Sequence, residues 1–358
     1  MGKPILVFPA GMPRSLTYLE SAQAAGKTVI GSSSLGNDPV RERYPLWVRL
    51  PYVTSPDFDD ALRCVISQFD IGGIFTPNPV VWDYINKKIK DTFPGTFLVN
   101  CNPIDSELTR YHKALQFEAE VLSEPLQLSA NGNPKPIVSE LVIASLFLHA
   151  ESIPGMCDHE KIRALTEIFR YTPLGDVVEI GTWWGKSAFV LNWLAGCYNV
   201  GKLLCIDPWS SEHIIQNDEN GFVDGIRVDA NEALTVFHLN LLPYAQGRLN
   251  YLRLPSVEAA KIYRMSLCVT SPEFGVTQLS GSIAVLHIDG NHNYDNVRSD
   301  IEVWSNRVVP GGWIIIDDYL WPYGDGPQRA GDEFLAAKFD SIELAFVMGG
   351  ALFLRLFK

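Results

Sequence analysis

The stretch from residue 175 to 188, GDVVEIGTWWGKSA, constrains the fold of this chain more than any other. Its β-branched apolar run at 177–180 predicts a buried strand of a parallel sheet. Gly181 and Gly185 then predict a tight turn that leaves room for a ligand, followed by an apolar helix to about residue 195. Strand, glycine turn and helix in this order are typical of nucleotide-binding α/β folds.

Two common phosphate-binding motifs do not fit this turn. The phosphate-cradling loop needs four residues between its first glycine and Gly-Lys-Ser, and only 182–184 stand there. The dinucleotide fingerprint needs glycines where Trp183 and Lys186 stand. The remaining pattern, acidic-x-Gly-x-x-x-Gly, resembles motif I of the class I S-adenosylmethionine (SAM) methyltransferases, with Trp183 replacing the usual middle glycine. An ordinary strand-turn-helix without a ligand is the alternative.

The resemblance implies a SAM site along this turn and the strands that follow it. After the second strand, Asp207 is expected to accept both ribose hydroxyls, because a carboxylate offers two acceptor oxygens; strand capping is its alternative role. Trp209 is expected to pack on the adenine, with Ser256 beside it. The full set of expected cofactor contacts is Glu179, Gly181, Thr182, Gly185, Ser187, Asp207, Trp209, Ser256 and Asp289.

Three aspartates follow two strands that are expected to be neighbours. Asp289 ends the first strand, and Asp317 and Asp318 end the second, at the edge where open α/β sheets place their sites. Three carboxylates there repel one another, and none is cheaply buried unpaired, so a divalent cation is expected. Oxygen ligands favour Mg²⁺, Mn²⁺ or Ca²⁺ over Zn²⁺.

The spacing of this region raises the resemblance from a class to a subgroup. The loop Asp289-Gly-x-His292 is followed by a predicted helix over 293–309, a predicted sharp Pro-Gly-Gly turn at 310–312 and the acidic pair. This order resembles the metal-dependent O-methyltransferases that modify sugars of macrolide antibiotics, over roughly residues 150–358. This implies that Asp289, Asp317 and Asp318 hold the metal and that His292 is the general base.

Alternatives remain for several of these residues. His292 could be a loop histidine bonded to the backbone, Asp289 could contact the cofactor without a metal, and His287 is a spare candidate. Trp321 and Tyr323 follow the acidic pair, and are either a substrate wall that stacks on a sugar or a latch over the site.

The chain is expected to be an α/β protein with two domains. Alternating strand and helix patterns over 1–125 predict a small Rossmann-like parallel-sheet domain, and the turn formers within 126–150 indicate a linker and connecting helix. Residues 151–358 are expected to form a seven-stranded Rossmann-like methyltransferase sheet that ends in an antiparallel hairpin. The N-terminal part resembles, more weakly, the nucleotide-fold domain that precedes the catalytic part of ATP-grasp enzymes.

Composition narrows the function further. The net charge of −12 disfavours nucleic acid or an acidic membrane as partner, and the six cysteines contain no Cys-x-x-Cys pair. The N-terminus enters a strand directly and no run reaches membrane-span length, so a cytoplasmic protein is expected. The polar stretch 210–229 is expected to be a functional loop, such as a lid.

The sequence therefore predicts a SAM-dependent, Mg²⁺-dependent O-methyltransferase that acts on a hydroxyl of a sugar or glycosylated small molecule. A metal-independent small-molecule methyltransferase and a nucleotide-binding scaffold protein without turnover are the alternatives. Relatives of this subgroup often form oligomers, which leaves a homo-oligomer open.

Overall fold

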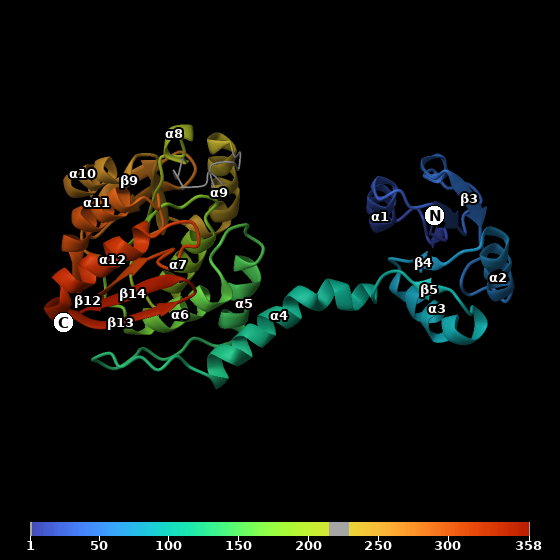
Figure 1. Ribbon diagram of the computed structural model, residues 1–358, viewed down its shortest axis with the longest axis horizontal. Coiled ribbons are helices and arrows are strands. Elements are labelled where there is room, and N and C mark those ends of the chain that lie inside the picture. Colours follow the sequence, from blue (N-terminus) through green and yellow to red (C-terminus); the bar gives the residue numbers. More distant parts are fainter. Residues whose placement is uncertain (1, 215–228, 358) are drawn as a thin grey trace. The chain divides into compact units, whose positions relative to one another are not determined.

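The computed structural model describes residues 2–214 and 229–357, and its chain divides into two units, Met1–His112 and Lys113–Lys358 (Figure 1). Helix α4 (Pro103–Ser123) crosses this division. The domain boundaries that the sequence predicts, at residues 125 and 150, remain a prediction. Within the described residues, no helix is both long and apolar enough to cross a membrane.

The first unit is built on a parallel sheet of five strands in the order β3-β2-β1-β4-β5. Helical spacing of apolar residues explains its packing, since α2 buries Phe58, Leu62 and Val65 on one face. Asn78 caps α3 by accepting backbone hydrogen bonds at its first turn. The elements are β1 (Ile5–Val7), α1 (Pro13–Ala24), β2 (Val29–Ser33), β3 (Leu46–Arg49), α2 (Phe58–Phe69), β4 (Gly73–Phe75), α3 (Pro79–Thr92) and β5 (Phe97–Leu98).

The second unit is built on a sheet of seven strands in the order β13-β14-β12-β11-β6-β7-β8. Strands β6, β7, β8, β11 and β12 are parallel, and the β13–β14 hairpin is antiparallel, which confirms the predicted sheet. The strands are β6 (Asp176–Ile180), β7 (Leu203–Ile206), β8 (Leu249–Leu252), β11 (Ile283–Ile288), β12 (Val308–Ile316), β13 (Ile342–Met348) and β14 (Ala351–Leu356).

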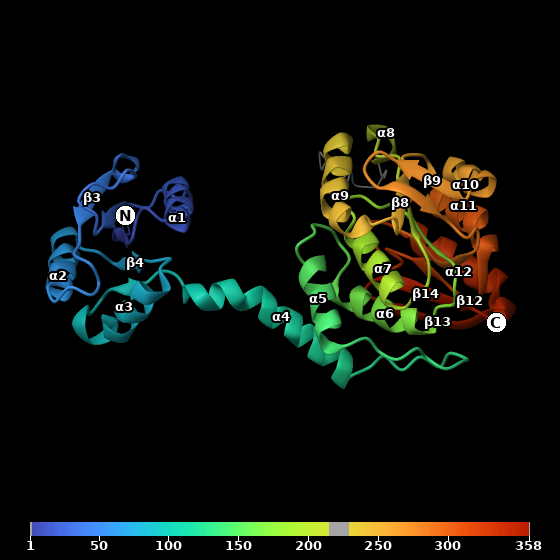
Figure 2. The same ribbon diagram turned by 180° about the vertical axis from the view of Figure 1, so that it is seen from behind.

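Helices cover both faces of this sheet. Alternate residues of each strand point to opposite faces, so Val177 and Val285 join one apolar cluster while Val178 and Leu286 join the other. Helices α5, α6, α7 and α9 cover the first face, and α10, α11 and α12 cover the second (Figures 1 and 2). Their bounds are α5 (Glu140–Ala150), α6 (His159–Tyr171), α7 (Lys186–Cys197), α9 (Ala230–Ala245), α10 (Ser256–Met265), α11 (Tyr294–Trp304) and α12 (Gly326–Ala337).

Local structure differs from the sequence prediction in three places. The helix expected to run from 293 to 309 ends at Trp304, because β12 already begins at Val308. The sharp turn expected at 310–312 is a bulge inside β12, since Val308 and Trp313 pair with Ile283 and Val285. A two-stranded sheet of β9 (Cys268–Ser271) and β10 (Gly275–Gln278) was not predicted. Most of the expected lid, residues 215–228, lies outside the described residues.

Candidate functional site

The glycine turn after β6 depends on backbone conformations that side chains oppose. Gly181 has φ +79°, and a β-carbon there would lie 1.9 Å from the carbonyl oxygen of Asp289. Gly185 has φ +88° where α7 begins. Trp183, which lies between these two glycines, also has a left-handed φ of +50°. The turn therefore lies in direct contact with the loop that carries Asp289.

Asp207 holds this turn in place. Its Oδ2 accepts hydrogen bonds from the backbone N–H groups of Thr182 (3.1 Å) and Trp183 (3.0 Å), and its Oδ1 accepts one from Trp209 (2.7 Å). Burial raises the pKa of the Asp207 carboxyl, and the three backbone donors oppose that rise. Because three of about four acceptor positions of its carboxylate are used, Asp207 has little capacity left for two ribose hydroxyls. In this structure its carboxylate holds the backbone of the turn in place.

Trp209 does not present its ring as predicted. The side chain is 1% exposed, its ring packs against Phe237 at 4.9 Å, and its Nε1–H donates to the carbonyl of Trp183 at 3.0 Å. An indole with both faces inside the apolar core has no face for adenine in this structure.

Glu179 and Ser256 also have partners within the protein. Glu179 is fully buried, and its Oε1 lies 3.1 Å from Nδ1 of His287 on the neighbouring strand, so it has no surface for direct contact with a cofactor. Ser256 begins α10, and its Oγ accepts a hydrogen bond from Trp304 Nε1 at 2.9 Å. Thr182 and Ser187 are buried within the turn and the first turn of α7.

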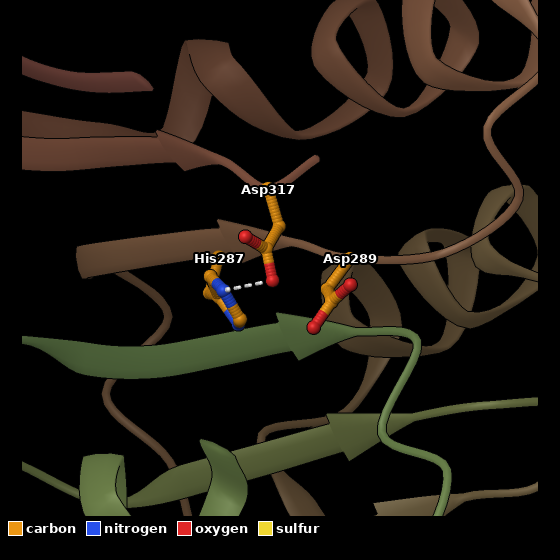
Figure 3. Close-up of side chains that lie close together, drawn as sticks. All are labelled: His287, Asp289 and Asp317. Carbon is orange, nitrogen blue, oxygen red and sulfur yellow. Dashed lines mark ion pairs between the residues drawn. The ribbon is translucent and has the colours of Figure 1, made fainter. Parts of the chain in front are cut away.

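The three predicted aspartates meet at the carboxyl ends of β11 and β12, as parallel neighbouring strands require. The backbone N–H of Asp289 bonds to Ile180 and that of Asp317 to Ile288, both at 2.8 Å, so the strand register fixes where these side chains begin. Figure 3 shows Asp317 pointing toward His287 and Asp289.

Side chains here form two groups that could each hold a metal ion, and Asp289 belongs to both. We call His287, Asp289 and Asp317 the inner group, and Asp289, His292 and Asp318 the outer group. Within each group the ligand atoms lie within 4.8 Å of one another. His287 and Asp317 are buried, whereas Asp318 is 38% exposed.

A lysine that the sequence analysis did not single out enters the inner group from α6. The ammonium of Lys161 contacts Oδ2 of Asp317 and lies 3.9 Å from Oδ2 of Asp289, with only 3% of the side chain exposed. Lys161 lies on the same helical stripe as the buried Leu165 and Ile168, and a charged residue in an apolar stripe was the available signal.

The pKa directions follow from this pairing. Burial opposes the charged form of Lys161, but the charges of Asp317 and Asp289 outweigh it and raise the pKa of the lysine. Burial would raise the pKa of Asp317, yet the Lys161 and His287 charges hold it well below its usual range. Burial, with the charge of Asp317, raises the pKa of Asp289.

His292 lies at the outer edge of the cluster. Its Nε2 is 2.9 Å from Oδ2 of Asp318, and its ring centroid is 4.6 Å from that of Trp321, which in turn contacts Tyr323. A β-carbon on Gly326 would lie 2.1 Å from the His292 carbonyl oxygen, so the start of α12 packs directly against this loop. The structure thus gathers Asp289, His292, Asp318 and Trp321 around one accessible surface.

Part of the second unit matches a known protein family. Residues 178–319 match a family described as "Methyltransferase domain". No curated protein sequence matches the chain. Among solved structures, the chain is similar to the O-methyltransferase NovP (20% identity, 55% of this chain and 81% of NovP, TM-score 0.37) and to the calicheamicin methyltransferase CalS11 (15%, 72% and 94%, 0.40). It is also similar to MycE methyltransferase from the mycinamycin biosynthetic pathway, in complex with Mg and S-adenosylhomocysteine (SAH) (17%, 63% and 56%, 0.37).

The matched region contains the glycine turn, both strand ends with their aspartates, and the central strands of the sheet. The final antiparallel hairpin lies beside β12, as expected for the sheet of class I SAM methyltransferases. Residues 178–319 of this chain therefore match a methyltransferase domain.

Proposed function

We propose that this protein transfers the methyl group of SAM to a hydroxyl of a sugar or glycosylated small molecule. We also propose that it uses a divalent cation, preferably Mg²⁺, with Mn²⁺ or Ca²⁺ as substitutes. One observation carries the proposal. The acidic cluster with His292 lies against the glycine turn, where a β-carbon on Gly181 would collide with the Asp289 carbonyl.

The donor atoms of the cluster suit a hard cation. They are carboxylate oxygens joined by imidazole nitrogen, and no cysteine belongs to either group, which favours Mg²⁺, Mn²⁺ or Ca²⁺ over softer metals. Asp289, Asp317 and Asp318 are the proposed ligands. When bound, such an ion would polarise the acceptor hydroxyl and orient it.

The other steps belong to side chains of this chain. His292 is the proposed base that accepts the hydroxyl proton, and the Asp318 carboxylate beside its Nε2 would stabilise the imidazolium that forms. Trp321 and Tyr323 would form an aromatic wall against which a sugar face can stack. Positioning of the hydroxyl toward the sulfonium methyl accounts for much of the remaining catalysis.

Thermal unfolding of the full chain with SAH, with and without Mg²⁺, tests the proposal. A ligand at about a hundred times its dissociation constant stabilises by about 2.7 kcal/mol, which is readily measured. Stabilisation by SAH that Mg²⁺ enlarges supports the proposal and justifies a screen of sugar acceptors, in which Asp318→Ala should abolish methyl transfer. Stabilisation by ATP or NAD alone would contradict it.

A metal-independent methyltransferase is the second candidate, and Lys161 favours it, because an ammonium already offsets part of the carboxylate charge. Methyl transfer that is unchanged by EDTA would select this candidate. In either case we propose residues 151–358 as the methyltransferase domain, preceded by a separate α/β domain over 1–125 and a connection over 126–150. We also propose a cytoplasmic protein whose partner is a small molecule.

A further inference from the structure

The position of Lys161 is fixed from two sides. Asp158 caps α6, accepting a hydrogen bond from the Lys161 backbone N–H at 2.7 Å. The turn between β13 and β14 packs on the same place, where a β-carbon on Gly349 would lie 2.6 Å from the backbone nitrogen of Lys161. The lysine side chain is therefore aimed into the inner group by the cap and the hairpin.

One carboxylate oxygen of Asp317 faces two positive or protonatable groups of the protein. Its Oδ2 contacts the Lys161 ammonium and lies 3.7 Å from Nε2 of His287. His287 in turn faces Glu179, so the contacts form a continuous buried chain from β6 to α6. The exposed fractions of the Lys161, Asp317 and His287 side chains are 3%, 7% and 0%.

We propose that the Lys161 ammonium is the permanent cation of the inner group, so that Asp317 does not ligate a metal in this chain and any divalent ion binds at Asp289 and Asp318, beside His292. This inference rests on the function proposed above and narrows its ligand set. A divalent ion placed between Asp289 and Asp317 would stand next to the ammonium and be repelled by it.

Charge and access both favour the outer position. The Lys161 ammonium offsets the negative charge of Asp317, so less charge is left there for a divalent ion to neutralise than at Asp289 and Asp318. The side chains of Asp289, His292 and Asp318 are 23%, 15% and 38% exposed, so an ion and an acceptor can reach them from solvent. Lys161 is thus a positioning residue, which holds Asp317 and sets the charge of the site.

A titration of the protein with Mn²⁺ in the presence of SAH tests this assignment without an activity assay. Electron paramagnetic resonance measures the free Mn²⁺ at each step and so gives the dissociation constant. The decisive variant is the double substitution Lys161→Met with Asp317→Asn, which removes one charge of each sign and so keeps the net charge of the site. Asp318→Asn is the matched loss of a proposed ligand. We expect Asp318→Asn to weaken Mn²⁺ binding by about tenfold or more, as loss of metal-site partners does.

The double variant should stay within about threefold of the wild type, as expected for sites that do not interact. A double variant that loses Mn²⁺ as strongly as Asp318→Asn would overturn the inference, because Asp317 would then be a ligand. Lys161→Met alone should bind Mn²⁺ about tenfold more tightly if it folds, since the inner position is opened; an unchanged affinity in a folded variant would also overturn the inference.

A double-mutant cycle on unfolding separates this inference from the proposed function. Either single substitution leaves a buried charge unpaired, and we expect each to raise the unfolding equilibrium constant on the order of a hundredfold, with the double variant recovering most of that loss. If the wild type binds SAH but no Mn²⁺, the metal part of the proposed function fails, and the cycle alone decides the role of Lys161. If the effects of the two single substitutions on unfolding are additive in that cycle, the inference that Lys161 is the cation of the inner group is overturned.

Discussion

A buried carboxylate that belongs to neither the inner nor the outer group makes stability depend on pH. Asp300 lies on α11, is 7% exposed, and burial raises its pKa to about 6, although a hydrogen bond with Ser256 opposes the rise. The usual value is 3.8. The folded state therefore binds the proton more tightly than the unfolded state, and stability must fall as pH rises from about 4 to about 6.

The magnitude follows from the size of the shift. About two pKa units correspond to about 3 kcal/mol of destabilisation above pH 6, and about half of this penalty is present at pH 5. Replacing Asp300 by Asn removes the charge while keeping an acceptor for Ser256. We expect Asp300→Asn to be more stable than the wild type by about 3 kcal/mol at pH 7.5 and by about half as much at pH 5.

Urea unfolding followed by tryptophan fluorescence at both pH values measures this difference. Trp304, at the end of the same helix, is fully buried and is one of the nine tryptophans that contribute to this signal. Glu302→Gln is the matched control, because Glu302 is 61% exposed on α11 and pairs with Arg298 at the surface, where such pairs contribute little. A stability difference between Asp300→Asn and the wild type that is the same at pH 5 and pH 7.5 would refute the reasoning.

Three further outcomes are expected. Gly181→Ala should abolish stabilisation by SAH. Gly275 also has a positive φ but no neighbour within 4 Å, so Gly275→Ala should lower only the free energy of unfolding, by the left-handed backbone cost of about 1–2 kcal/mol. Equal effects of the two substitutions on stabilisation by SAH would contradict the contact with Asp289. His292→Gln should lower kcat by about 10²–10⁴ while SAH binding persists, and an unchanged kcat would remove its role as base. Arg355→Met should lower the free energy of unfolding by about 3–5 kcal/mol, because it leaves the buried Glu343 carboxylate, which Arg355 binds at 3.0 Å, without its partner. Urea unfolding measures this loss, and a loss below about 1 kcal/mol would count against a buried ion pair.

The architecture of the second unit could be predicted because its signals are local. β-branched runs, the glycine turn and the closing hairpin each determine one element, and parallel strands bring their carboxyl ends to one edge. That rule was sufficient to predict that Asp289, Asp317 and Asp318 would meet.

Partners that come from distant parts of the chain could not be predicted in this way. Lys161 reaches Asp317 from a helix more than a hundred residues earlier, and no periodicity or spacing links the two. Asp207 has the expected position at the end of its strand, but its hydrogen bonds go to the turn rather than leaving it free for a ligand. The bulge at 310–312 appears as a turn in sequence, because Pro and Gly mark both.

The hairpin of β13 and β14 has a consequence for how the protein is made. Strand β14 is inserted between β12 and β13, and Gly349 in its turn packs on the helix that carries Lys161. During synthesis, β12 therefore has an open apolar edge, and the lysine lacks its support, until the ribosome has released residues 349–356. A nascent chain arrested before this point has all the acidic residues of its site but neither a complete sheet nor the packing of Gly349 on α6, so the site is assembled only after this hairpin has been made.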